Sequence, residues 1–358
     1  MKRVLICVAL GAWVCSGFAM SAWDLYMQLL AEKARAEKGV VFTYGMPEVW
    51  ANYGKIFARI KELYEITQQD IDMGSPVVLA RMTEEKASKN DLADAKTGFA
   101  VTLASRGLTS DYCVSCWDAL PEWARGIDPH TGSVWYAAYW GAIGFLVNVD
   151  LVKNVPQSWA DLLTYAQEYQ GLVEYSDPRS TGTGITIVQA IAYAVSGDPY
   201  DYVAGVEFLK KLHDAGVIGA VAPLVTVARW QRGEIAILIN FDYNLLKWKE
   251  ENPEINSVVV IPADGTVSMS NAVIMAKNAP HPYTARLVLE FILCGEGQKL
   301  FAEGFAHPVN TKVSIPSEIA AKFPPKEAYQ NVVFVDAVKQ RELSPALIDY
   351  YSKVIFGG

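Results

Sequence analysis

The strongest restriction on the fold of this chain comes from short stretches of β-branched, aromatic and other apolar residues that end at polar turns. Val40 to Tyr44 ends at Gly45, and Ile235 to Ile239 ends at Asn240. Strands that are apolar at every position, rather than at every second one, are typical of parallel sheets buried on both faces. Helical patterns follow these stretches. The alternation predicts the α/β class, with mostly parallel sheets flanked by helices.

At 358 residues, the chain is long enough for two such units. Apolar residues from Glu48 onward recur at helical spacing, which predicts a helix after the first strand. Trp135 to Asn148 predicts extended chain, while the many small polar groups between Ala93 and Pro129 predict irregular structure.

The segment from Ser180 to Gly184 predicts a loop that begins a helix. It carries Ser180, Thr181, Gly182 and Thr183, and an apolar stretch without Gly or Pro follows it. Backbone N–H groups in a first helical turn have no intrahelical partner, and the helix dipole is positive there. Together with the hydroxyls, they predict a binding site for an anion. The alternative is an ordinary helix cap, for which Ser and Thr are the usual residues.

Three further polar positions follow expected strands. Tyr44 ends the first strand, Ser75 is expected to cap the next helix, and Asp242 lies just beyond Ile239. Ligands of α/β sheets bind outside the carboxyl ends of the strands. We therefore expect these loops to lie on the same side of the fold as Ser180. For each residue, a purely structural role is the alternative.

The amino terminus has the form of a secretory signal peptide, with Lys2 and Arg3 before an apolar run and small residues after it. Residues 1–22 are the expected signal, with cleavage after Ala19 or Ala22. This predicts a periplasmic protein. Removing the signal leaves Cys113, Cys116 and Cys294. An odd number means at least one free thiol.

The spacing of the first two cysteines would allow a local disulfide between Cys113 and Cys116. Cys294 lies in an apolar stretch and is expected to be a small buried residue.

In this order, these segments resemble the two-lobed substrate-binding proteins of ABC importers. That class includes ferric-, phosphonate-, sugar-phosphate-, thiamine- and polyamine-binding proteins. The resemblance is carried by the segments Val40–Tyr44, Pro156–Leu163, Ser180–Gly184, Gly233–Tyr243, Pro262–Thr266, Ala285–Phe291, Gly295–Gln298 and Pro308–Val309.

The resemblance implies a type 2 periplasmic binding protein, with two α/β lobes that close on a solute by hinge motion. The expected crossings between the lobes lie near Trp135 to Gly144 and near Ile261 to Thr266. Residues 23–140 and 264–358 would form one lobe and residues 141–263 the other. An ABC permease in the inner membrane is the implied partner, and a monomer is expected.

The resemblance also ranks the possible ligands. In ferric-binding members, the loop that matches Ser180 to Gly184 holds a phosphate or carbonate, and a tyrosine pair supplies phenolates to the iron. Here Asp242 stands at the first of these positions, with Tyr243 at the second. A phosphorylated or phosphonate-type solute ranks first, ferric iron with an anion second, and a polyamine or thiamine third.

The expected ligand-binding residues are Tyr44, Ser75, Ser180, Thr181, Gly182, Thr183, Asp242 and Tyr243. No cofactor or resident metal is expected.

Other classes of function fit less well. The net charge of −8 and the lack of a Lys/Arg cluster argue against nucleic acid. The sequence has four histidines and contains neither HExxH nor GxSxG, which argues against an exported hydrolase. A sensor that presents its solute to a receptor would share the fold, and the sequence does not separate it from a transport protein.

Overall fold

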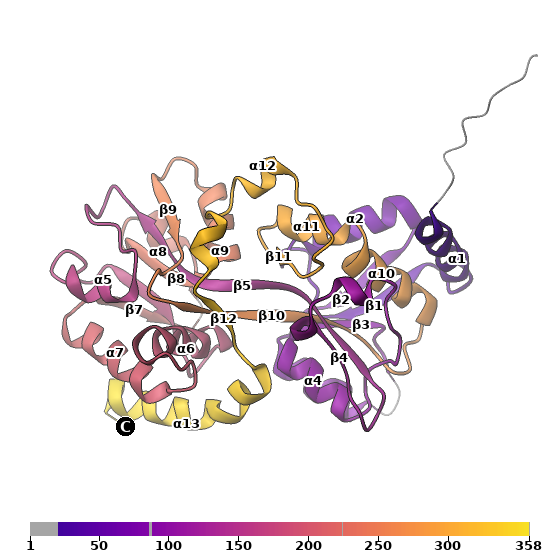
Figure 1. The fold of residues 1–358 in the computed structure, drawn as a ribbon, viewed down its shortest axis with the longest axis horizontal. Coiled ribbons are helices and arrows are strands. Elements are labelled where there is room, and N and C mark those ends of the chain that lie inside the picture. Colours follow the sequence, from indigo (N-terminus) through magenta and orange to yellow (C-terminus); the bar gives the residue numbers. More distant parts are fainter. Residues whose placement is uncertain (1–20, 86–87, 224, 358) are drawn as a thin grey trace, which may run out of the picture.

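The computed structural model describes residues 21–85, 88–223 and 225–357. Most of the expected signal peptide, residues 1–20, lies outside this part. The fold consists of two α/β halves joined by two long strands that run through the middle of the molecule (Figure 1). These strands are β5 (Val134–Asn148) and β10 (Thr266–Met275), and they pair antiparallel. We call the half that contains β1 lobe 1 and the half that contains β6 lobe 2.

Lobe 1 contains a sheet in which β1 pairs in parallel with β2 and β3. Its first core lies between this sheet and α1, α2, α10 and α11, and a second, smaller core lies under α3 and α4. The elements are α1 (Ala22–Ala36), β1 (Val40–Tyr44), α2 (Tyr53–Tyr64), β2 (Thr67–Ile71), α3 (Ser75–Glu84), β3 (Leu92–Lys96), α4 (Thr97–Ser105), β4 (Arg125–Ile127), α10 (Pro282–Cys294) and α11 (Gly297–Glu303), with short 3₁₀ helices at Trp117–Ala119 and Glu122–Ala124.

Lobe 2 contains the order β8-β6-β7, in which β6 pairs in parallel with both neighbours. Every residue of β6 and β8 is buried, whereas β7 at the edge of the sheet is partly exposed. The elements are α5 (Trp159–Thr164), β6 (Val173–Ser176), α6 (Gly182–Ser196), α7 (Tyr202–Asp214), β7 (Ile218–Ala222), α8 (Ala228–Gln231), β8 (Ile237–Phe241), α9 (Asp242–Glu251) and β9 (Ser257–Val260).

The strand β5 belongs to both lobes. Its first part pairs with β4 and with β11 (His307–Pro308), and its last part pairs with β8 and β9. The extended chain predicted between Trp135 and Asn148 is therefore confirmed.

The prediction of irregular structure between Ala93 and Pro129 was wrong for the first part of this region, which includes most of β3 and all of α4, whereas residues 106–116 contain no helix or strand. The residues Leu92–Lys96 include two alanines and no β-branched residue, so burial between β1 and β10 decides their conformation. The helix expected from Glu48 begins only at Tyr53. The proposed lobe boundaries, 23–140 with 264–358 and 141–263, stay a prediction.

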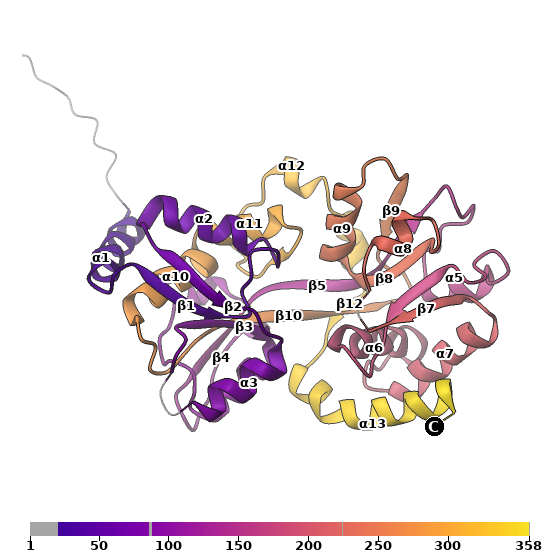
Figure 2. The ribbon, with the colours of Figure 1, turned by 180° about the vertical axis from the view of Figure 1, so that it is seen from behind.

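The carboxyl-terminal part of the chain runs along both lobes. It contains α12 (Ser317–Ala320), a 3₁₀ turn at Lys326–Tyr329, β12 (Val332–Phe334) and α13 (Ala337–Phe356). Gln340 on α13 donates to Thr186 and Gln189 of α6, whereas Arg341 donates to Thr102 of α4. From behind, α13 lies beneath lobe 2, and its first turns reach the middle of the molecule beside lobe 1 (Figure 2). The chain ends beside lobe 2, at the opposite end of the molecule from α1 (Figure 1).

The disulfide joins Cys116 to Cys294, which are 178 residues apart in the sequence. The local bond considered between Cys113 and Cys116 is therefore wrong, as is the prediction that Cys294 is a simple buried hydrophobe. Cys113 is free and exposed, which agrees with the odd number of cysteines. The bond links the segment before β4 to the end of α10, a pairing that sequence spacing does not reveal.

Candidate functional site

The two lobes face each other at the carboxyl ends of their parallel strands. The Lys96 ammonium at the end of β3 lies 4.4 Å from the ring centroid of Phe241 at the end of β8. The ring centroids of Trp50 and Tyr243 lie 5.8 Å apart, edge to face. These contacts cross from lobe 1 to lobe 2. The helices α3 and α4 begin on one side of this interface, and α6 and α9 begin on the other.

The first turn of α6 leaves backbone donors free. Thr181 is the N-cap, and its Oγ1 accepts from the Gly184 N–H at 3.0 Å. The N–H groups of Ser180 and Thr181 donate to the Asp177 carbonyl. Within the described residues, the N–H groups of Gly182 and Thr183 have no acceptor. This turn therefore offers two adjacent donors at the positive end of a long helix.

Two glycines shape this turn in different ways. A Cβ on Gly182 would meet no atom within 4 Å, so the backbone is open to an approaching group. A Cβ on Gly184 would lie 2.4 Å from the Pro178 nitrogen, so only glycine fits there. Gly184 packs the loop against β6, and Gly182 leaves its donors uncovered.

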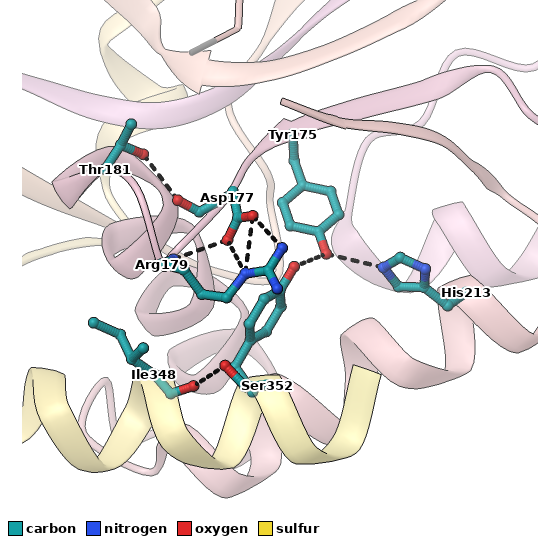
Figure 3. A network of polar contacts seen from close by, with 8 residues as sticks. Tyr175, Asp177, Arg179, Thr181, His213, Ile348 and Ser352 are labelled. Atoms are coloured by element: carbon teal, nitrogen blue, oxygen red, sulfur yellow. Dashed lines mark hydrogen bonds and ion pairs between the residues drawn. The ribbon is translucent and has the colours of Figure 1, made fainter. Parts of the chain in front are cut away.

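Arg179 is directed away from this turn (Figure 3). Its guanidinium pairs with the Asp177 carboxylate, with Nη2 at 2.6 Å from Oδ2, and lies over the ring of Phe356 in α13. Burial alone would raise the pKa of Asp177, but the hydrogen bonds from Arg179 outweigh it and lower this pKa. The Arg179 guanidinium is thus held in an ion pair within lobe 2 and does not face the free donors of α6.

Tyr44 and Ser75 support the surrounding structure. Tyr44 is buried under α3, where its hydroxyl donates to Glu85 Oε1 at 2.8 Å and Arg81 lies over its ring. Burial raises its pKa to about 12. Ser75 is the first residue of α3, so the cap is Gly74 and the expected N-cap role was wrong. The Ser75 Oγ accepts instead from the Lys96 N–H at 2.9 Å.

The carboxylate of Asp242 is fully buried and has four protein donors. Oδ1 accepts from the N–H groups of Ala142 and Tyr243 at 3.0 and 2.9 Å. Oδ2 accepts from His307 Nε2 at 2.7 Å and from the Tyr329 hydroxyl at 2.8 Å. In this conformation a solute would find no free oxygen on Asp242. The residue connects lobe 2 to β5 and to the carboxyl-terminal segment.

Tyr243 is buried between aromatic rings. It stacks on Phe241 with centroids 5.3 Å apart, and within the described residues its hydroxyl has no hydrogen-bond partner. Burial raises its pKa well above the usual value, so the phenol stays protonated. Tyr243 lines an interlobe cavity of about 270 Å³, together with Trp50, Asn244 and Lys247. A buried hydroxyl without a partner is rare in folded proteins, and here it belongs to a residue that lines the cavity between the lobes.

Comparison with known proteins places this arrangement in a family. The family described as bacterial extracellular solute-binding protein matches residues 55–325. The chain belongs to this family.

This solute-binding protein is similar to two related sequences and to one solved structure. It is 28% identical over 250 residues to an uncharacterized protein of Haemophilus influenzae, covering 67% of this chain and 68% of the relative. It is 24% identical over 262 residues to a "Putative 2-aminoethylphosphonate-binding periplasmic protein" of Salmonella paratyphi A, covering 71% and 72%.

The solved structure is AfuA from Actinobacillus pleuropneumoniae with bound fructose-6-phosphate. It superposes with a TM-score of 0.70 at 20% identity, over 89% of this chain and 99% of that one. The match confirms the two-lobed fold predicted from the sequence.

Sequence reasoning missed Lys96 in this solute-binding protein. Lys96 is the last residue of β3 and the N-cap of α4, and its side chain is partly buried. Burial lowers its pKa to about 8, although the Asp94 carboxylate acts in the opposite direction. A single lysine directly after Leu92-Ala93-Asp94-Ala95 was the available signal. That segment has no β-branched residue, so its sequence does not predict a strand that would bring the lysine to the interface.

Metal clusters and membrane-spanning helices are absent from the described residues. No three His, Cys, Asp or Glu side chains come together there in a way that could hold a metal ion. No described helix is long and apolar enough to cross a membrane.

Proposed function

We propose that this protein captures a small solute with a phosphate or phosphonate group between its two lobes. The observation that carries the proposal is the first turn of α6, where the N–H groups of Gly182 and Thr183 are unpaired and uncovered. Tetrahedral oxyanions suit such a turn because several oxygens can accept from adjacent N–H groups. Ser180 and Thr183 add hydroxyl groups for which the described residues show no acceptor.

The names of the relatives support this class of solute. One related protein is named for 2-aminoethylphosphonate, and the AfuA structure holds a sugar phosphate. We take 2-aminoethylphosphonate as the first probe. Ferric iron ranks below it because the Asp242 carboxylate, which would replace a tyrosine ligand, already has four donors. A polyamine or thiamine would meet N–H groups where a cation needs acceptors.

The same proposal includes the protein's place in the cell and its partner. Residues 1–22 would act as a secretory signal, and the mature protein would act in the periplasm as a monomer that delivers its solute to an ABC permease. Ser21 caps α1 and forms a capping box with Asp24. Cleavage after Ala19 would keep this cap, whereas cleavage after Ala22 would remove it. We propose a binding role for this protein and no enzymatic one. We also propose that residues 23–140 and 264–358 form lobe 1 and that residues 141–263 form lobe 2.

Calorimetric titration of the mature protein tests the solute class. The panel contains 2-aminoethylphosphonate, fructose 6-phosphate, inorganic phosphate, ferric citrate, spermidine and thiamine. We expect heat only with the first three. Gly182→Phe should abolish this binding with little change in melting temperature, because a side chain there has free space in the unliganded protein. Normal binding by Gly182→Phe, or binding of ferric citrate alone, would refute the proposal.

A matched variant controls for the loss of a hydroxyl. Thr183→Ala removes a hydroxyl beside the free donors, and Thr164→Ala removes an exposed one on α5. We expect weaker binding only for Thr183→Ala.

A further inference from the structure

Lys96 is a charged group whose role the fold does not explain. Its ammonium lies at the interface between the lobes, 4.4 Å from the ring centroid of Phe241. Within the described residues, no Asp or Glu oxygen lies within 4.0 Å of it, and no hydrogen-bond acceptor contacts it. The nearby Asp94 carboxylate accepts from Tyr53, Tyr139 and Asn271. The Asp94 carboxylate favours the charged form of Lys96 without a direct contact. A partly buried ammonium that no anion contacts directly is costly.

The backbone around Lys96 is fixed in place. Its N–H donates to the Ser75 Oγ at 2.9 Å, and Thr97, the next residue, donates to the Ser270 carbonyl on β10 at 3.0 Å. These contacts hold the junction between β3 and α4 against two neighbouring elements. The position of the side chain at the lobe interface is therefore determined by the fold of lobe 1.

Strand register relates Phe241, the residue beneath Lys96, to the loop that leads into α6. In lobe 2, Glu174 of β6 is paired with Leu238 of β8. Three residues further along these parallel strands stand Asp177 and Phe241, at the same edge of the sheet. Asp177 begins the loop that leads to α6, and Phe241 is the ring beneath the Lys96 ammonium. The lysine of lobe 1 thus lies over the edge from which the α6 donors of lobe 2 start.

We propose that Lys96 supplies the lobe 1 contact to the anionic group that the first turn of α6 holds in lobe 2. This inference rests on the proposed function and deepens it. One phosphonate or phosphate would then accept from backbone N–H groups of lobe 2 and from the ammonium of lobe 1. The anion would connect the two lobes, so that the charge of the solute favours the closed form. A neutral analogue would not bring the lobes together in this way.

Three variants test this role by calorimetry with 2-aminoethylphosphonate. Lys96→Met should weaken binding about 10- to 100-fold, which is the loss expected for one hydrogen bond to a charged group. Lys61→Met removes the same charge from the exposed surface of α2 and should bind as the wild type does. Lys96→Arg should keep most of the affinity. Without ligand, Lys96→Met should melt no lower than the wild type, because it removes a partly buried charge.

The pH dependence gives a second readout. Since the pKa of Lys96 is lowered to about 8, the ammonium is progressively lost above that pH. Wild-type affinity should therefore fall between pH 7.5 and 9.5, whereas Lys96→Arg should show little change. Wild-type affinity in Lys96→Met would overturn the role of Lys96 and leave the proposed function intact. Failure of the wild type to bind any phosphate or phosphonate would overturn the proposed function, and this inference with it.

Discussion

His307 Nε2 lies 2.7 Å from Oδ2 of Asp242, although the two residues are 65 positions apart in the sequence. His307 is in β11, which pairs with β5, and Asp242 begins α9. The His307 ring stacks on Trp140 with centroids 4.0 Å apart, so its orientation is fixed. The pair connects lobe 2 to the strand that passes between the lobes.

Asp242→Asn should destabilise the protein. An amide has one oxygen, so it cannot accept from Ala142, Tyr243, His307 and Tyr329 together. We expect the free energy of unfolding to fall by about 1–3 kcal/mol, the usual penalty for a buried polar group left unpaired. Urea unfolding measures this change. Asp214→Asn, at an exposed ion pair with Lys210, is the control and should stay within about 0.5 kcal/mol of the wild type.

Gly141→Ala should destabilise the junction between the lobes. A Cβ at this position would lie 2.3 Å from Cδ1 of Tyr243, so the ring has to move. We expect a loss of about 1–3 kcal/mol, as for other overpacked sites. Gly182→Ala adds the same methyl group where nothing lies within 4 Å. Equal melting temperatures for the two variants would contradict the packing described for Tyr243.

Stability should depend on pH through Asp94. Burial raises the pKa of this carboxyl to about 6, although hydrogen bonds from Tyr53 and Asn271 act against the shift. In the folded state, Asp94 thus keeps its proton at a pH where the same residue in the unfolded chain has lost it. The contribution of Asp94 to the free energy of unfolding therefore falls as the pH rises from about 4 to 6.

Asp94→Asn lacks this titration. Its free energy of unfolding relative to the wild type should therefore increase between pH 4 and 6.5, by at most about 3 kcal/mol, and then stay constant. Urea unfolding at several pH values would show this, and a constant difference would argue against a raised pKa.

Loss of the disulfide should be costly. Cys116→Ser opens a bond that closes a very long loop, and we expect a loss of about 2–4 kcal/mol in the free energy of unfolding. Cys113→Ser is the matched control and should have little effect, because that thiol is exposed and unpaired. Alkylation of the folded, unreduced mature protein should modify Cys113 alone. Modification of Cys294 instead would show that a different pair forms in solution.

The sequence predicted those parts of the fold that depend on local pattern. The apolar strands before Gly45 and Asn240 and the loop at Ser180 could be recognised because composition, turn residues and helix starts lie close together. The strands β3 and β10 were not recognised. In β10 every residue is buried, yet Ser268, Ser270 and Asn271 interrupt its apolar pattern. Their burial depends on partners such as Asp94, which bonds to Asn271 and lies far away in the sequence.

The candidate site also has features that the local sequence predicts and features that depend on the tertiary fold. The free N–H groups of α6 follow from one segment, so the sequence was sufficient to indicate them. The environments of Tyr44 and Asp242 depend on Glu85, His307 and Tyr329, which reach them only through the tertiary fold. Lys96 gains its significance from Phe241, a residue of the other lobe.

The two ends of the described chain lie at opposite extremes of the molecule, with α1 at the far side of lobe 1 and the end of α13 beside lobe 2 (Figure 1). Two fluorescent proteins, one fused before α1 and the other after α13, would therefore be attached to different lobes. Any rotation of one lobe toward the other would change their separation and hence the energy transfer between them. The native arrangement of the termini makes this chain suited to an optical sensor for its own solute, with no need for an internal label.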